Sequence, residues 1–146
     1  MNYHRKVKNE VRTNDFISPE IGKKPAKVFI DLPAPGCIDL KELLKNKVIN
    51  RNTFVIAVEG KSQDETEKQH QKNLRKIEKF LKANFKKYYL WGKSFHTLKL
   101  DEVLGKKKVD FAYFDFCGSL SPELFAWFYQ YRNCFTKDCS FSWLSK

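Results

Sequence analysis

Residues 109–118 have the sequence VDFAYFDFCG, which is the most apolar run in the chain. The run ends in a carboxylate, Asp115, followed by a glycine-bearing turn. Ser121 and Pro122 then supply an N-cap and a first helical residue for an aromatic helix that we expect to end at about Cys134. A continuous apolar strand, rather than an alternating one, is typical of the middle of a parallel sheet covered on both faces. We therefore expect a functional site at the carboxyl end of this strand.

Strands and helices alternate along the rest of the chain. Short apolar or aromatic runs predict four more strands, over residues 27–32, 53–58, 87–91 and 140–144. Apolar residues at helical spacing predict helices over residues 40–47, 64–85 and 98–104. We expect Asp39 to cap the first of these helices, Asp64 and Glu65 to lie in the first turn of the second, and Gly105 to stop the third. This order predicts an α/β fold with an open, mainly parallel sheet of about five strands and flanking helices.

Length and charge indicate one domain and a polyanionic partner. The 146 residues suffice for one domain over residues 27–146, preceded by a flexible basic arm over residues 1–26. The net charge is +11, and residues 61–108 carry fourteen Lys and Arg against six Asp and Glu. Such asymmetry favours a nucleic-acid partner, and the alternative is a lysine-rich solubilising surface. The candidate nucleic-acid contacts in the arm are Arg5, Lys6, Lys8, Arg12, Lys23 and Lys24.

Two groups of lysines have simpler interpretations. Lysines at the end of the predicted helix over residues 64–85 suit the negative end of the helix dipole. The tribasic run at residues 106–108 precedes the central strand, so it lies at the edge opposite the expected site. We interpret that run as a solvated loop rather than a recognition element.

Several classes of protein are disfavoured. The four cysteines form no CxxC pair, and a zinc site built from Cys117, Cys134, Cys139 and His96 matches no metal-binding spacing, so we expect no metal. No signal peptide or membrane span is visible, and reduced cysteines favour a cytoplasmic location. No GxGxxG motif is present, which disfavours a dinucleotide-dependent oxidoreductase.

The first two predicted strands end in features that suit a ligand. Residues 33–36, with the sequence PAPG, connect the first strand to a helix N-terminus, where backbone N–H groups can face a ligand. Glu59 closes the second strand, and a carboxylate can accept hydrogen bonds from two adjacent ribose hydroxyls. The alternative is a solvent-exposed glutamate at a strand end.

With these elements placed, residues 27–145 resemble a shortened class I S-adenosylmethionine-dependent methyltransferase, with a three-layer Rossmann-like fold. The segments FIDLPAPG (29–36), VIAVE (55–59), LWGKSF (90–95) and AYFDFCG (112–118) are similar to its first loop, its ribose-binding acid, its adenine loop and its catalytic motif. The chain departs from the family in four ways. The first loop has one glycine and two prolines, Lys93 stands where an acid commonly binds adenine, Asp115 is not followed by prolines, and two of seven strands are missing.

The resemblance implies two competing functions. In a small nucleic-acid methyltransferase, S-adenosylmethionine would be bound by Asp31, Pro33, Gly36, Glu59, Trp91 and Phe95. Asp115 would orient the methyl acceptor, and Phe116 could stack on a flipped base. Alternatively, the chain is a catalytically inactive Rossmann-like protein, viral or accessory, that binds nucleic acid or a protein complex. The free sheet edge and the aromatic C-terminal helix also lead us to expect a protein partner or a homo-oligomer.

Overall fold

The structure is a computed structural model that describes residue 20, residues 22–115 and residues 121–144. Within these ranges, the side chains of residue 115 and residues 141–144 are not described. Residues 1–19, 21, 116–120 and 145–146 lie outside the description.

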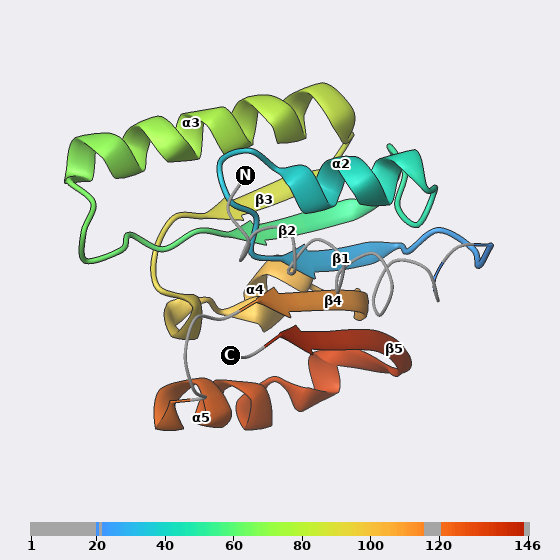
Figure 1. Ribbon diagram of the computed structural model, residues 1–146. Helices are drawn as coiled ribbons and strands as arrows, with labels where there is room; N and C mark the ends of the chain where they lie inside the picture. The colour runs from blue at the N-terminus through green and yellow to red at the C-terminus, as the bar shows by residue number, and fades with distance from the viewer. Residues whose placement is uncertain (1–19, 21, 116–120, 145–146) are drawn as a thin grey trace.

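The centre of the protein is one five-stranded sheet in which every neighbouring pair of strands is parallel. Its strands are β1 (Val28–Asp31), β2 (Phe54–Val58), β3 (Tyr88–Trp91), β4 (Val109–Asp115) and β5 (Phe135–Leu144). The spatial order is β3-β2-β1-β4-β5, and all arrowheads point to the left in Figure 1. The predicted open parallel α/β fold is confirmed. The strand order reverses between β1 and β4, which is where an open α/β sheet offers a crevice to a ligand.

Helices cover both faces of the sheet. The first face packs against α2 (Ile38–Lys45) and α3 (Glu67–Asn84), which lie above the sheet in Figure 1. The second face packs against η3 (Phe95–Thr97), α4 (Leu100–Leu104), α5 (Pro122–Gln130) and η4 (Arg132–Cys134). Side chains alternate between the faces along each strand, so both sets must be apolar to be buried.

Strand β1 shows why the central runs are continuously apolar. Phe29 belongs to the core on the α2–α3 face, and Ile30 belongs to the core on the α4–α5 face. Both side chains have no exposed surface. Phe29 also stacks on Phe111 of β4, with 4.8 Å between the ring centroids. Burial on two faces therefore accounts for the apolar composition of residues 111–114 without reference to a function.

The starts of two long helices follow from local capping chemistry. Ser121 caps α5 by accepting a hydrogen bond from the Leu124 N–H at 3.2 Å, and Pro122 is the first helical residue, as predicted. Helix α3 begins with a capping box in which Thr66 and Gln69 each bond to the other's backbone N–H.

Four predicted boundaries were wrong. Asp39 does not cap α2, because Cys37 is the N-cap residue and Asp39 lies buried inside the helix. Asp64 and Glu65 precede α3 rather than forming its first turn, because the capping box places the N-cap at Thr66. Strand β5 begins at Phe135 rather than residue 140, and α5 correspondingly ends at Gln130. No helix in the described ranges combines the length and apolarity that a membrane crossing requires.

Candidate functional site

Four predicted site residues lie at the carboxyl ends of adjacent strands. In spatial order from β3 to β4 they are Trp91, Glu59, Asp31 and Asp115. Asp31 is level with Ala57 of β2 and Tyr113 of β4, so Glu59 and Asp115 each lie two residues beyond that level. We call this the carboxyl edge; it is at the left of the sheet in Figure 1. The parallel register thus brings together residues that span most of the chain.

The loop between β1 and α2 is compact. Pro33 is buried, and a tight turn closes where the Cys37 N–H donates to the Ala34 carbonyl at 2.9 Å. Cys37 has left-handed backbone angles (φ 51°, ψ 38°), which normally favour glycine. Gly36 is exposed, and an added Cβ would meet only the Ile38 side chain, at 3.7 Å. The strained position of this loop is therefore Cys37, which the sequence did not indicate.

Carboxylates make the surroundings of this loop electronegative. Asp31 has no exposed surface, and Asp39 is 6% exposed. The pKa of the Cys37 thiol is raised to about 12, mainly by burial and also by the negative charges of Asp39, Asp31 and Glu59, while Lys41 acts in the opposite direction. Cys37 is therefore a protonated thiol at neutral pH and not a nucleophile.

Glu59 is half-buried and titrates near neutrality. Its pKa is raised to about 7, mainly by burial and also by the negative charges of Glu65 and Asp39, while His70 acts in the opposite direction. The carboxyl group therefore exchanges between a hydrogen-bond donor and a double acceptor around pH 7. This shift distinguishes Glu59 from an ordinary glutamate at a solvated strand end.

His70 joins this edge and was not found from the sequence. The ring is 3% exposed, and its Nε2 lies 2.8 Å from the carbonyl oxygen of Gly92. A carbonyl can only accept, so Nε2 carries the proton in this contact. Nδ1 is buried and has no hydrogen-bond partner among the described residues. His70 shares a helical stripe with Ile77 and Leu81, so the periodicity of α3 already predicted that it would face inward.

The two predicted adenine-contacting rings have different surroundings. Trp91 is half-buried, and its Nε1 donates to Ser94 and Thr97 at 3.2 and 3.1 Å. The Lys93 ammonium lies 5.5 Å from the centroid of the indole ring. Phe95 is 7% exposed and packs against core rings, including that of Trp127 at 4.5 Å. Trp91 is thus the more accessible of the two aromatic candidates.

The two predicted nucleic-acid contacts that the structure describes are not at this edge. Lys23 and Lys24 precede β1, so they lie at the other end of the strands, and Lys23 forms an ion pair with Glu20 at 3.2 Å. The candidates Arg5, Lys6, Lys8, Arg12 and Phe116 lie outside the described residues. The structure therefore separates the two described lysines from the proposed cofactor residues.

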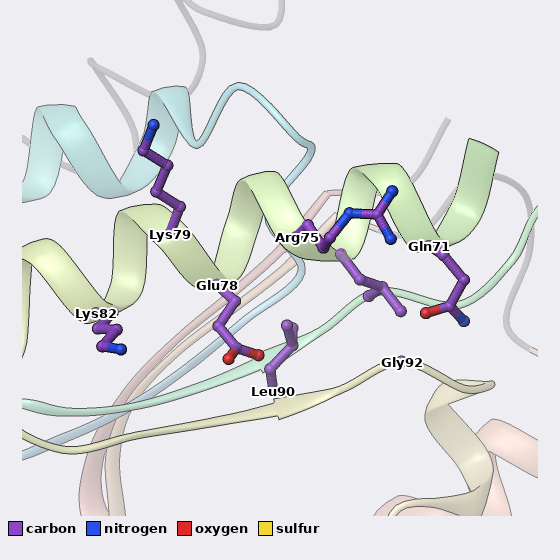
Figure 2. A pocket seen from close by; sticks show the side chains of 8 residues that line it. Gln71, Arg75, Glu78, Lys79, Lys82, Leu90 and Gly92 are labelled. Carbon is purple, nitrogen blue, oxygen red and sulfur yellow. The ribbon is translucent and has the colours of Figure 1, made fainter. Parts of the chain in front are cut away.

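Figure 2 shows a cavity of about 550 Å³ between α3 and the edge strand β3. Its lining consists of Gln71, Leu74, Arg75, Glu78, Lys79, Lys82, Leu90 and Gly92. A Cβ on Gly92 would come within 2.7 Å of Leu74 Cδ1, so a glycine is needed where α3 crosses this strand end. None of the predicted cofactor residues lines this cavity.

No protein-family model, curated protein or solved structure matches this chain. The fold and the geometry of the sheet edges are therefore the basis for assigning a function. The five-stranded parallel sheet with helices on both faces is compatible with a Rossmann-like fold. Within the described residues, no group of three or more His, Cys, Asp or Glu side chains is arranged to hold a metal ion.

The carboxyl edge can bind a polar ligand through carboxylates rather than through backbone amides. Pro33 and Pro35 have no N–H, and the Leu40 N–H of α2 is already bonded to the Asp39 carboxylate at 3.0 Å. The negative charge of the edge opposes a phosphate and favours a ligand with positive charge or hydroxyl donors. The chemistry available here is therefore binding and orientation, with Glu59 as the group that titrates at neutral pH.

Proposed function

We propose that this protein binds S-adenosylmethionine at the carboxyl edge and is a small methyltransferase-like protein that acts on nucleic acid. The observation that carries the proposal is the line of acids at the ends of adjacent strands, with Glu59 half-buried after β2 and Asp31 buried at the end of β1. This edge adjoins the point at which the strand order reverses, where open α/β sheets bind their ligands.

The charge of the edge favours a cationic cofactor. S-adenosylmethionine carries a sulfonium and an ammonium group, which the carboxylates of Asp31, Asp39 and Glu59 would attract. A phosphate-bearing dinucleotide would be repelled by the same carboxylates, and the loop offers it few N–H donors. The electrostatics thus support S-adenosylmethionine over a nicotinamide or flavin dinucleotide.

Each residue has a defined role in this proposal. Glu59 binds the ribose hydroxyls, Trp91 contacts the adenine, and the loop from Asp31 to Gly36 contacts the methionine end. The sulfonium already activates the methyl group, so the protein contributes mainly by positioning the acceptor. Asp115, at the end of β4, would orient that acceptor, and the positive net charge would attract the nucleic acid.

A second candidate is a catalytically inactive protein on the same scaffold. The burial of Phe95 in the core and the prolines of the first loop favour it, because both reduce the contacts available to a cofactor. The two candidates differ in whether bound cofactor loses its methyl group when an oligonucleotide is added.

Calorimetry with S-adenosylmethionine and its demethylated product tests the proposal. We expect micromolar binding that strengthens as the pH rises from 6 to 8, because deprotonation of Glu59 supplies the second acceptor oxygen. The Glu59→Gln variant should bind at least tenfold more weakly and lose the contribution of this group to the pH dependence. Glu78→Gln, at an exposed position of α3, is the matched control and should behave as wild type. Absence of binding to either compound would overturn the proposal.

Transfer of a labelled methyl group to oligonucleotides then separates the two candidates. Cofactor binding with methylation of RNA or DNA supports the enzyme. Cofactor binding without transfer to either nucleic acid supports the inactive scaffold.

A further inference from the structure

Basic side chains precede four of the five strands and gather at the edge opposite the proposed cofactor site. We call this set the basic edge: Lys24, Lys27, Arg51, Lys86, Lys87, Lys106, Lys107 and Lys108. All of these residues are exposed. Because the strands are parallel, the segments that lead into them meet at one edge of the sheet, at the right of Figure 1.

Backbone hydrogen bonds confirm that these segments are neighbours. The Phe54 N–H donates to the Lys27 carbonyl at 2.9 Å, and the Lys86 N–H donates to the Arg51 carbonyl at 3.0 Å. The segments before β1, β2 and β3 are therefore held side by side. The tribasic run before β4 also lies beside them, because Asp110, two residues after this run, is bonded to the backbone of Lys27 and Val28.

Asp110 lies beside this set, and it has a structural role. Its two carboxylate oxygens accept hydrogen bonds from the backbone N–H groups of Lys27 and Val28, at 3.0 and 2.9 Å. These bonds join the start of β4 to the start of β1. In the part of the chain that the structure describes, no ion pair links a side chain of the basic edge to a carboxylate.

A cavity of about 640 Å³ opens within the basic edge. Among the residues that line it are Lys24, Lys27, Lys107, Lys108, Asn50 and Asn52, together with apolar residues such as Val28. These residues carry four ammonium groups and two amides, which are hydrogen-bond donors. The one carboxylate in the lining, that of Asp110, is already bonded to two backbone N–H groups. This lining suits an anion with several oxygen acceptors, such as a phosphate group.

Two lysines of this edge are held close together against mutual repulsion. The Nζ atoms of Lys87 and Lys107 lie 4.6 and 5.6 Å from the centroid of the Phe54 ring. The charge of Lys107 lowers the pKa of Lys87. The aromatic ring offsets part of the repulsion, and a bound anion would offset the rest.

We propose that the basic edge is a binding site for the phosphodiester backbone of a nucleic acid, separate from the carboxyl edge. The segments before β3, β2, β1 and β4 cover about 15 Å across the sheet at about 4.8 Å per strand. That width faces several phosphates, because duplex DNA carries one charge per about 1.7 Å. Lysines act as point charges without the paired donors of arginine, so they suit contact with the backbone rather than with bases.

This inference deepens the nucleic-acid part of the proposed function, since it names the surface that contacts the nucleic acid. The two edges are separated by the length of the strands, about 13 to 23 Å for four to seven residues. Binding at the basic edge therefore needs no cofactor and does not place a base at Asp115 by itself.

Fluorescence anisotropy with a labelled single-stranded 20-mer, as DNA and as RNA and without cofactor, tests the inference on the full chain. The triple variant Lys24→Ala, Lys107→Ala, Lys108→Ala should bind at least tenfold more weakly at 0.1 M salt. The slope of log affinity against log salt should fall by about 2, since each lost contact removes about 0.7 for a single strand. The matched control Lys68→Ala, Lys72→Ala, Lys76→Ala removes three exposed charges from α3 and should change affinity less than twofold.

The inference would be overturned by no binding of the wild type, by equal losses in both triple variants, or by equally tight binding of a labelled polyglutamate to the same lysines. Competition by millimolar inorganic phosphate that displaces the oligonucleotide completely would instead assign the cavity to a small phosphate and also overturn it. Circular dichroism of both variants checks folding. Calorimetry with S-adenosylmethionine separates this inference from the proposed function, because the basic-edge variant should bind the cofactor as the wild type does.

Discussion

At the carboxyl edge of the sheet Asp31 and Asp39 are buried and Glu59 is half-buried, whereas at the basic edge Lys27, Lys87 and their basic neighbours are exposed. Buried acids respond to their surroundings through the pKa, as the value of about 7 for Glu59 illustrates. Exposed lysines keep their charge and exchange counterions with the solvent. Substitutions at the first edge should therefore change stability with pH, and substitutions at the second should change affinity with salt.

The largest expected effect comes from the one acid that holds the basic edge together. Asp110→Ala removes the acceptor for the backbone N–H groups of Lys27 and Val28. We expect the free energy of unfolding to fall by about 3 kcal/mol, because hydrogen bonds to charged groups contribute about 1.5–3 kcal/mol each and one of these is exposed. Urea denaturation measures the loss. Asp138→Ala, at an exposed position of β5, is the control and should cost less than 0.5 kcal/mol, about the usual limit for surface changes.

The same Asp110→Ala variant should affect stability and affinity in opposite directions. Removing this negative charge should increase the affinity of the basic edge for an oligonucleotide, while the fold becomes less stable. A loss of stability below about 1 kcal/mol would mean that water replaces the carboxylate at the two N–H groups.

A smaller effect is expected from Glu59→Gln at the carboxyl edge. The pKa in the folded protein is raised from 4.5 to about 7, so the folded state binds a proton more tightly than the unfolded chain. Stability from this group is fully present below pH 4.5 and is lost as the pH rises through about 7. The full rise in pKa would be worth about 3 kcal/mol at pH 8, and solvent screening of this half-buried group reduces that figure. The variant, which imitates the protonated form, should therefore be about 2 kcal/mol more stable than wild type at pH 8 and equal to it at pH 4. Denaturation curves at the two pH values measure this, and a gain that does not depend on pH would contradict it.

The smallest effect concerns the lysines that share the Phe54 ring. Lys107→Gln removes the main cause of the lowered pKa of Lys87, so that pKa should return towards 10.5. An NMR titration of the Lys87 side chain measures the change, and 0.5 M salt should produce part of it in the wild type. Lys93→Gln, after β3 at the opposite edge, is the control. An unchanged pKa of Lys87 in the Lys107→Gln variant would show that the two ammonium groups do not interact.

The sequence predicted the sheet well because its central strands are buried on two faces. Residues 54–58 and 111–114 had to be apolar throughout, and that pattern is visible without a structure. Strand β5 was predicted to begin five residues too late, because polar residues occupy its first half and only pairing with β4 identifies it. The cap of α2 was missed because it depends on the left-handed conformation of Cys37, which no side-chain preference indicates.

The candidate site was predicted only in part. Glu59 and Asp31 were found because each closes an apolar strand. His70 was missed because its partner, the carbonyl of Gly92, is 22 residues away and nothing in the sequence links them. The tribasic run at residues 106–108 was interpreted as a solvated loop, since its relation to Lys27 and Lys87 arises only from the parallel register. Local sequence patterns do not predict interactions between residues that are far apart in the chain.

The parallel strands place basic residues before four strands at one edge of the described sheet and acids after three strands at the other. Each of the four strands from β3 to β4 is entered past basic residues, and β1, β2 and β4 are followed by or end in acids. The electric field of a polyanion would orient such a molecule before contact, with the basic edge towards the phosphates and the carboxyl edge away from them. Orientation during approach would therefore follow from the topology. Under the proposed function, a base that reaches Asp115 would have to come from a free end or loop of the nucleic acid that bends around the domain.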